Sequence, residues 1–182
     1  MRSPSRRIFL KTAGATGLAI ATPMANANII TNPTAGERKL KLRNLHTGEK
    51  LSATYWEEGG YISEELAAID HVLRDHRSGE AIHMDHALLD QIHALQQRLG
   101  HKGTIEIISG YRSPATNAML ARNSNGVAKK SFHMLGRAID LRMPGVELKD
   151  LRKAALKLKS GGVGYYPNSN FVHLDTGRPR FW

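Results

Sequence analysis

The chain contains no cysteine among its 182 residues, which excludes disulfide bonds and thiolate metal sites. Any bound metal ion must therefore be held by histidine, aspartate or glutamate side chains. Acidic residues are also few, at 16 against 26 lysines and arginines, so the formal net charge is +10. This excess favours an anionic partner or polymer without identifying it. Aromatic residues make up only 6% and do not interleave with a basic stripe, which argues against nucleic-acid binding.

The sequence also lacks an apolar run long enough for a transmembrane helix. Its apolar stretch near the N-terminus is short, follows a basic segment and ends before Ala25-Asn26-Ala27, a typical cleavage sequence. The run Ser5-Arg6-Arg7-Ile8-Phe9-Leu10-Lys11 closely resembles the twin-arginine export motif. Residues 1–27 are therefore predicted to be a twin-arginine-type signal peptide. Its removal would leave a periplasmic protein without stable membrane insertion.

The remaining chain is expected to form one domain at 39–182, preceded by a flexible leader at 28–38 that contains Pro33 and Gly36. Period-two strand patterns alternate with amphipathic helical patterns along this domain. We expect strands at 39–45, 51–56, 104–108, 138–143, 163–166 and 171–175, and helices at 64–76, 86–99, 114–122 and 147–158. The helical connections are uneven in length, and the strand pairs can be antiparallel. The pattern therefore predicts a single-domain α+β fold, with helices packed on a small, mainly antiparallel sheet.

Helix-capping residues support three of these helices. Ser63, Asp85 and Ser113 each precede a helical pattern and are predicted N-caps. Pro114 suits the first helical position after Ser113, and Gly100 is predicted to end the second helix.

Two segments carry the residue types of a catalytic zinc site. His133 and Asp140 are spaced as H-x-x-G-x-x-x-D, and His173 follows in Phe171-Val172-His173-Leu174-Asp175. Two imidazoles and one carboxylate form a catalytic zinc set that leaves a fourth position open for water. The strand period places Asp140 and His173 opposite the apolar side chains of their strands. Taken singly, either histidine could be an ordinary residue, but together the three predict one Zn²⁺ per chain in a common cleft.

Two further residues are candidates for the chemistry beside the metal. Asp175 shares a strand face with His173 and is predicted to be either the general base or a carboxylate that orients a histidine ligand. Arg112 lies on a turn between a strand and a helix, where it would bind a substrate carbonyl or carboxylate, or form a surface salt bridge. A second group, at a helix start, is interpreted as solvated or capping: His83, Asp85, His86 and His93.

Several longer motifs resemble those of a known family. They are Asn44–Glu49, Gly110–Ser113, Gly126–Ser131, Gly161–Pro167 and Ser169–Gly177. As a set they resemble the zinc D-Ala-D-Ala peptidases of the hedgehog-like fold group, and most closely the murein endopeptidase K branch. The resemblance covers nearly all of the predicted domain.

The resemblance implies a periplasmic zinc endopeptidase with that fold, acting on the peptide cross-links of peptidoglycan during cell-wall remodelling. The favoured bond would join two diaminopimelate residues, the 3-3 cross-link. On the matching positions, His133, Asp140 and His173 carry over as zinc ligands and Arg112 as the substrate-polarising residue. Ser131 carries over as a support for the ligand loop.

One position departs from the wider family. Many members place a catalytic carboxylate three residues before the last histidine ligand, where this chain has Asn170, which cannot act as a base. Asp175 is the natural substitute. The departure also favours an alternative function, a non-catalytic peptidoglycan-binding or regulatory module on the same fold. The sequence does not indicate an oligomeric state.

Overall fold

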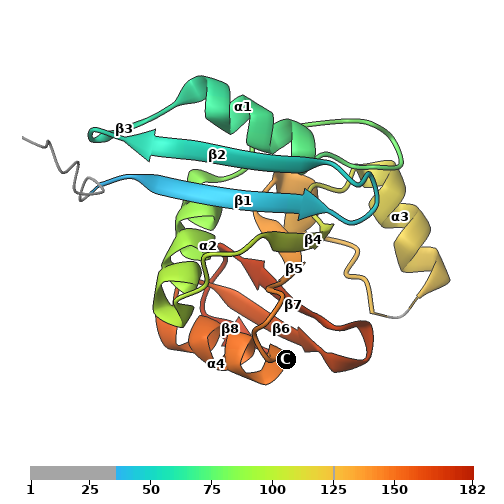
Figure 1. Ribbon diagram of the computed structural model, residues 1–182. Helices are drawn as coiled ribbons and strands as arrows, with labels where there is room; N and C mark the ends of the chain where they lie inside the picture. The colour runs from blue at the N-terminus through green and yellow to red at the C-terminus, as the bar shows by residue number, and fades with distance from the viewer. Residues whose placement is uncertain (1–35, 125) are drawn as a thin grey trace, which may run out of the picture. The chain divides into compact units, whose positions relative to one another are not determined.

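Eight strands form one open, mixed sheet in the part of the chain that the computed structural model describes, residues 36–124 and 126–182 (Figure 1). The strands are β1 (Arg38–Asn44), β2 (Lys50–Glu57), β3 (Gly60–Tyr61), β4 (Ile105–Ser109), β5 (Ala138–Arg142), β6 (Gly162–Tyr166), β7 (Phe171–Asp175) and β8 (Arg180–Phe181). Their order is β3-β2-β1-β4-β5-β7-β6-β8. The β1–β4 and β6–β8 pairs are parallel and the other neighbouring pairs are antiparallel. The predicted α+β fold with a mainly antiparallel sheet is confirmed.

Within the described residues, four α-helices and two short 3-10 helices accompany this sheet. They are α1 (Ser63–Val72), α2 (His86–Leu99), α3 (Pro114–Asn123) and α4 (Leu148–Leu158), with the 3-10 helices η1 (Phe132–Leu135) and η2 (Pro167–Ser169). Helix α1 packs on β1 and β2, α2 packs on β1 and α4, and α4 also contacts β6 and β7. A single hydrophobic core joins α1, α2 and α4 to buried side chains of β1, β2, β4, β5, β6 and β7, so these three helices cover the apolar side of the sheet.

The predicted caps are confirmed at two helices and wrong at the third. The Asp85 carboxylate accepts from the Ala87 amide, and the Ser113 hydroxyl accepts from the Thr116 amide. Ser63 is instead the first residue of α1, and Ile62 precedes it without a side-chain cap.

Helix α1 also ends at Val72, earlier than the predicted end near His76. The backbone of the next residues serves other contacts, because the Leu73 carbonyl accepts from the Tyr111 amide and the Asp75 amide donates to the Glu80 carbonyl. The early end therefore ties this connection to the β4–α3 turn.

The pairing of β5 with β7 has the register that the sequence pattern requires. Asp140 lies opposite His173, while the flanking pairs are Ile139 with Leu174 and Leu141 with Val172. The four apolar side chains are completely buried in the core. The two strands therefore present their metal-type side chains on the face opposite the core, as predicted.

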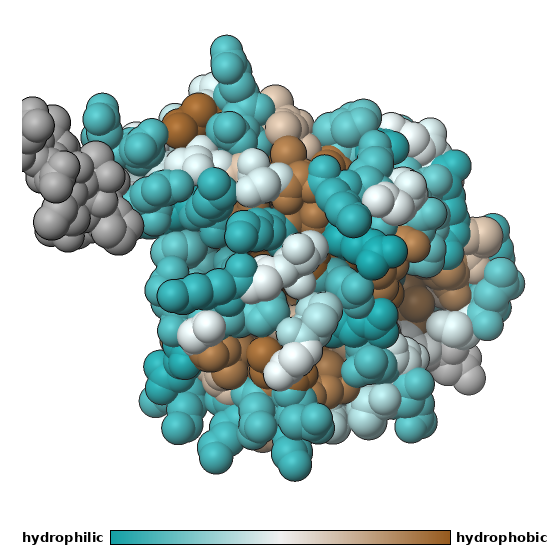
Figure 2. Space-filling model, viewed as in Figure 1, coloured by the Kyte–Doolittle hydropathy of each residue, from teal (hydrophilic) through white to brown (hydrophobic). Residues whose placement is uncertain are grey.

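The predicted signal peptide at 1–27 and most of the predicted leader at 28–38 lie outside the described residues. Strand β1 begins at Arg38, next to the predicted start of the domain. In residues 36–124 and 126–182, none of the helices combines the length and the apolar character needed to cross a bilayer. Figure 2 shows a largely hydrophilic face on which hydrophobic side chains gather in small separate groups.

A substitution at Gly161, in the α4–β6 connection, tests how closely this connection approaches β7. A Cβ atom at this position would overlap the Asp175 carbonyl oxygen. We expect Gly161→Ala to lower the free energy of unfolding by about 1–3 kcal/mol, measured by urea denaturation. Gly60→Ala is the matched control, because its Cβ would lie 4.0 Å from the nearest atom, the Glu57 carbonyl oxygen. Equal stability of the two variants would contradict the close approach.

Candidate metal centre

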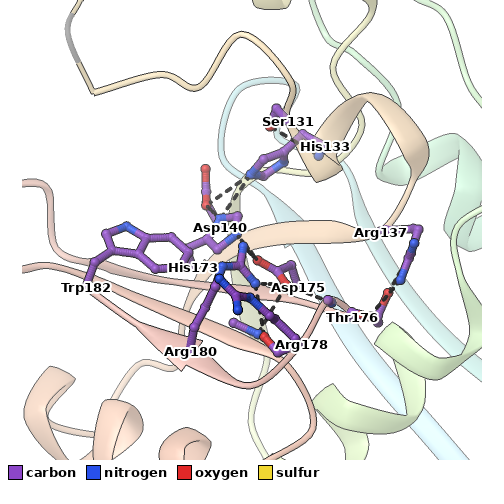
Figure 3. Close-up of polar contacts among 12 residues, drawn as sticks. Ser131, His133, Arg137, Asp140, His173, Asp175, Thr176, Arg178, Arg180 and Trp182 are labelled. Carbon is purple, nitrogen blue, oxygen red and sulfur yellow. Dashed lines mark hydrogen bonds and ion pairs between the residues drawn. The ribbon is translucent and has the colours of Figure 1, made fainter.

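Three buried side chains from η1, β5 and β7 converge on the non-core face of the sheet (Figure 3). The Nδ1 atom of His173 lies 2.8 Å from Oδ1 of Asp140 and 3.2 Å from Nε2 of His133. The third side of the triangle, from His133 Nε2 to Asp140 Oδ1, measures 3.3 Å. The structure thus brings together all three predicted ligands, although they lie up to 40 positions apart in the chain.

The donor set and its spacing fit a zinc ion. Tetrahedral zinc with bonds of about 2.0–2.1 Å to nitrogen and oxygen places its ligand atoms about 3.3 Å apart. The observed separations of 2.8–3.3 Å are close to this value. Three protein ligands leave one position for water or substrate, as in catalytic zinc sites. Among the described residues, the other histidines that the sequence analysis set aside do not join this group.

His133 is held in the tautomer that a metal requires. Its Nδ1 lies 2.6 Å from the Gly110 carbonyl oxygen, which can only accept, so Nδ1 carries the proton and Nε2 keeps a free lone pair. Burial lowers the pKa of His133, which keeps the ring neutral. Gly136 ends η1 in a left-handed conformation with φ of 66°, and its close approach to the His83 carbonyl excludes a side chain there.

His173 is oriented from its other side by Asp175. Its Nε2 lies 3.2 Å from Asp175 Oδ2, which leaves Nδ1 to face the other two ligands. Burial opposes protonation of His173, but hydrogen bonds to Asp140 and then Asp175 raise its pKa. The imidazole is therefore in contact with two carboxylates, one within the ligand triangle and one behind it.

Asp175 is completely buried, and both of its carboxylate oxygens accept hydrogen bonds. Arg180 donates to both carboxylate oxygens, at 2.9 Å and 2.7 Å, and the amides of Gly162 and Gly177 donate to Oδ1 at 3.1 Å and 2.8 Å. Burial alone would raise the pKa of Asp175, but hydrogen bonds with His173 and Arg180 hold it well below its usual range. Asp175 therefore contacts one candidate ligand, His173, while both of its oxygens also accept from other donors.

Arg112 lies beside the ligand triangle and contacts it directly. Its Nη2 is 3.2 Å from Asp140 Oδ2, and its Nε donates to the Ser109 hydroxyl at 3.1 Å. Asp140 therefore offers Oδ1 to a metal and Oδ2 to the arginine. Burial alone would raise the pKa of Asp140, but its interaction with His133 and its hydrogen bonds with both histidines hold that pKa well below its usual range. The predicted alternative for Arg112, a surface salt bridge, does not fit a side chain that is 12% exposed.

Asp75 supports the turn that carries Arg112, and the sequence analysis missed it. Its Oδ2 accepts from the Ser113 amide at 2.9 Å, and the Leu73 carbonyl nearby accepts from the Tyr111 amide at 2.8 Å. Asp75 is 1% exposed, and hydrogen bonds from Thr116 and Ser113 lower its pKa despite burial. A Cβ on Gly110 would collide with the Leu73 carbonyl, so the turn packs directly on the end of α1. Sequence reasoning had no signal for this role, because Asp75 lies inside the helix predicted at 64–76.

Ser131 and Asn170 occupy different environments. The Ser131 hydroxyl accepts from the His133 amide at 3.3 Å and caps η1, a contact that suits its predicted supporting role. Asn170 is exposed at the β6–β7 turn with φ of 53°, and it does not line the cleft.

The C-terminal residues close one side of the cleft. The Trp182 ring lies 5.3 Å from the His173 ring, and its Nε1 donates to the Tyr166 hydroxyl at 2.8 Å. Sequence reasoning missed Trp182 and Arg180 because the strand that carries Arg180, β8, has two residues and no periodic pattern.

The triad opens into a cleft of about 480 Å³. Besides the three candidate ligands, its walls include Arg112, Tyr166, Phe171 and Trp182 on the sheet side and residues of the loop after α3. The site therefore combines a metal-type donor set, a buried cation beside it and room for an extended ligand.

Comparison with known proteins identifies similar chains. A family model described as peptidoglycan L,D-endopeptidase MepK matches residues 32–182. The peptidoglycan L,D-endopeptidase MepK of Escherichia coli (strain K12) is 47% identical over 98% of this chain and 97% of its own. The probable peptidoglycan L,D-endopeptidase MepK of Haemophilus influenzae is 41% identical over 98% of this chain and 95% of its own. The resemblance read from the motifs is thereby confirmed.

Metal binding provides the first test of the site. We expect the purified protein to bind one zinc ion per chain, and His133→Ala to lower zinc affinity by more than about 100-fold, because a ligand is lost from a three-residue set. Competition with a chromophoric chelator measures the affinity. His83→Ala is the matched control, since His83 has a side chain that is 98% exposed and lies outside the triad. Equal zinc affinity of the two variants would exclude His133 as a ligand.

Proposed function

This chain belongs to the peptidoglycan L,D-endopeptidase MepK family, and we propose that it is a periplasmic zinc enzyme that hydrolyses 3-3 cross-links between diaminopimelate residues. The observation that carries the proposal is the buried triangle of His133, Asp140 and His173 at the base of a cleft. Peptidoglycan is the substrate class in the names of its relatives, which match nearly the full length of this chain.

The residues around the triangle have complementary tasks in hydrolysis. When bound, a zinc ion would supply Lewis acidity toward a carbonyl oxygen and toward water in the open position. Arg112, charged and largely buried beside Asp140, is placed to hold the carbonyl oxygen of the scissile bond as negative charge develops on it. The Gly110 carbonyl and Asp175 keep the two imidazoles in fixed tautomers and orientations.

Asp175 acts through His173 in this proposal. Its oxygens accept five hydrogen bonds, from Arg180, His173 and two amides, so the carboxylate has little capacity left for a substrate water. We therefore propose that it orients His173 and strengthens it as a ligand. The general-base role remains the alternative prediction for the same residue.

The position of Asn170 removes the reason for favouring a non-catalytic module. The residue is exposed on the β6–β7 turn, so its identity does not affect the lining of the cleft. The buried triad and Arg112 retain the groups that metal-assisted hydrolysis requires.

Export by the twin-arginine route belongs to the same proposal. Its support is the Ser5–Lys11 motif and the cleavage sequence Ala25-Asn26-Ala27, together with a substrate class that lies outside the cytoplasmic membrane.

Digestion of intact sacculi tests the proposed reaction. Mature protein would be incubated with purified sacculi that contain both 4-3 and 3-3 cross-links, with added zinc or with a chelator, and the muropeptides separated by chromatography. We expect loss of the 3-3 dimers only when zinc is present. Loss of 4-3 dimers instead would reassign the bond, and an unchanged profile with zinc bound would favour the non-catalytic module.

The two roles of Asp175 make opposite predictions for zinc. For Asp175→Asn we expect zinc affinity to fall about 10- to 100-fold, because the imidazole loses its orienting carboxylate, with cleavage partly recovered at saturating zinc. Chelator competition and muropeptide release measure the two effects. Retained zinc affinity with lost cleavage would instead identify Asp175 as the general base. Asp150→Asn is the matched control, since Asp150 lies on α4 outside the cleft.

A further inference from the structure

The cleft continues beyond the metal centre to a second group of polar side chains. His46, from the β1–β2 turn, and His76 and Arg77, from the α1–α2 connection, line the same cleft as the candidate ligands. The two imidazoles stack with ring centroids 3.8 Å apart and planes 9° from parallel. No role in the proposed hydrolysis has been assigned to these three residues.

Charge is distributed unevenly along the cleft. The only carboxylates in its described lining are Asp140 and Asp175, and both belong to the metal centre. The rest of the lining carries no acidic side chain, and its permanently charged cations are Arg77, Arg112, Lys130 and Arg180, of which Arg180 pairs with Asp175. Away from the metal, the cleft therefore favours an anionic group.

Arg77 is available to a ligand. It is exposed, and its guanidinium takes no part in the ion pairs of the described residues, whereas Arg74 and Arg112 each pair with a carboxylate. Its charge is close enough to contribute to lowering the pKa of both His76 and Arg112, although burial is the larger cause for each. In the described structure, the ring nitrogens of His46 and His76 also have no hydrogen-bond partner.

Asp75 fixes this group relative to the metal centre. Its Oδ1 accepts from the Arg77 amide at 2.9 Å, and its Oδ2 accepts from the Ser113 amide at 2.9 Å. One buried carboxylate thus holds the backbone at Arg77 and the turn that carries Arg112. The two backbone segments that carry Arg77 and Arg112 are thereby kept at a set spacing, which favours preorganised recognition of a two-point ligand.

We propose that Arg77 and the stacked pair of His46 and His76 form a carboxylate-binding subsite for a free carboxylate of the peptide substrate. The guanidinium supplies a charged fork for the carboxylate, and the imidazole edges supply further polar contacts. This inference rests on the proposed function, because stem peptides of peptidoglycan carry free carboxylates beside the cross-link. The subsite would hold one of these while the scissile carbonyl lies at the metal centre.

Steady-state cleavage of paired substrates tests the subsite. Purified 3-3 muropeptide dimers with free diaminopimelate and glutamate carboxylates would be compared with the same dimers converted to primary amides. For Arg77→Gln we expect KM for the free dimer to rise about tenfold with kcat nearly unchanged, and Arg77→Lys to recover part of the loss. On the amide, the wild type and Arg77→Gln should be equal. Arg98→Gln is the matched control, an exposed arginine on α2 outside the cleft.

A binding measurement separates this proposal from the proposed function. Zinc-loaded protein would be titrated calorimetrically with the uncross-linked stem tripeptide, which offers carboxylates but no cross-link to cleave, and with its amide. We expect Arg77→Gln to weaken binding of the free tripeptide about tenfold and to leave binding of the amide unchanged. If Arg77→Gln weakens tripeptide binding in this way but the wild type cleaves no dimers, the proposed function is contradicted and the subsite is supported. The subsite alone would be overturned if Arg77→Gln cleaved both dimers as the wild type does and also bound the free tripeptide as tightly as the wild type.

Discussion

The antiparallel pairing of β5 with β7 sets Asp140 directly opposite His173, and the rest of the site depends on that register. The pairing is fixed by the opposite face, where Ile139 and Leu174 form one completely buried cross-strand pair and Leu141 and Val172 another. A slip of one residue would turn these apolar side chains out of the core and turn the metal-type side chains into it. Core burial on one face therefore determines the ligand geometry on the other.

His133 reaches the same point without belonging to the sheet. It depends on the short helix η1, whose left-handed end at Gly136 returns the chain to β5, and on the Gly110 carbonyl, which fixes its ring. Gly110 in turn packs on the end of α1 at Leu73. The third candidate ligand is therefore placed by contacts between segments distant in sequence, and the Asp75 carboxylate anchors the same turn. This explains why the end of α1, far from the ligands along the chain, contributes to their positions.

Local sequence patterns predicted the sheet and the residues of the candidate metal site, whereas the supporting residues are placed by tertiary contacts. The period of two identified the faces of Asp140 and His173, and the cap at Asp85 gave the start of α2. The early end of α1 was not predictable, because the Leu73 carbonyl accepts from the amide of Tyr111, a residue more than thirty positions away. Arg180 gave no signal either, since its strand has two residues and its partner carboxylate is recognisable only once β6, β7 and β8 are aligned.

The placement of charge around the cleft gives the substrate a direction. The charge of Asp175 is neutralised by Arg180. The Asp140 carboxylate has one oxygen in the triangle of candidate ligands and the other next to Arg112. A divalent cation bound in the triangle would offset the remaining negative charge, so the metal end would attract a polarisable carbonyl rather than a second cation. Cations without an acid line the rest of the cleft, which repels basic peptides and attracts acidic ones. In the proposed binding mode, an acidic, cross-linked peptide would place its scissile bond at the triad and a free carboxylate at the cationic end of the cleft.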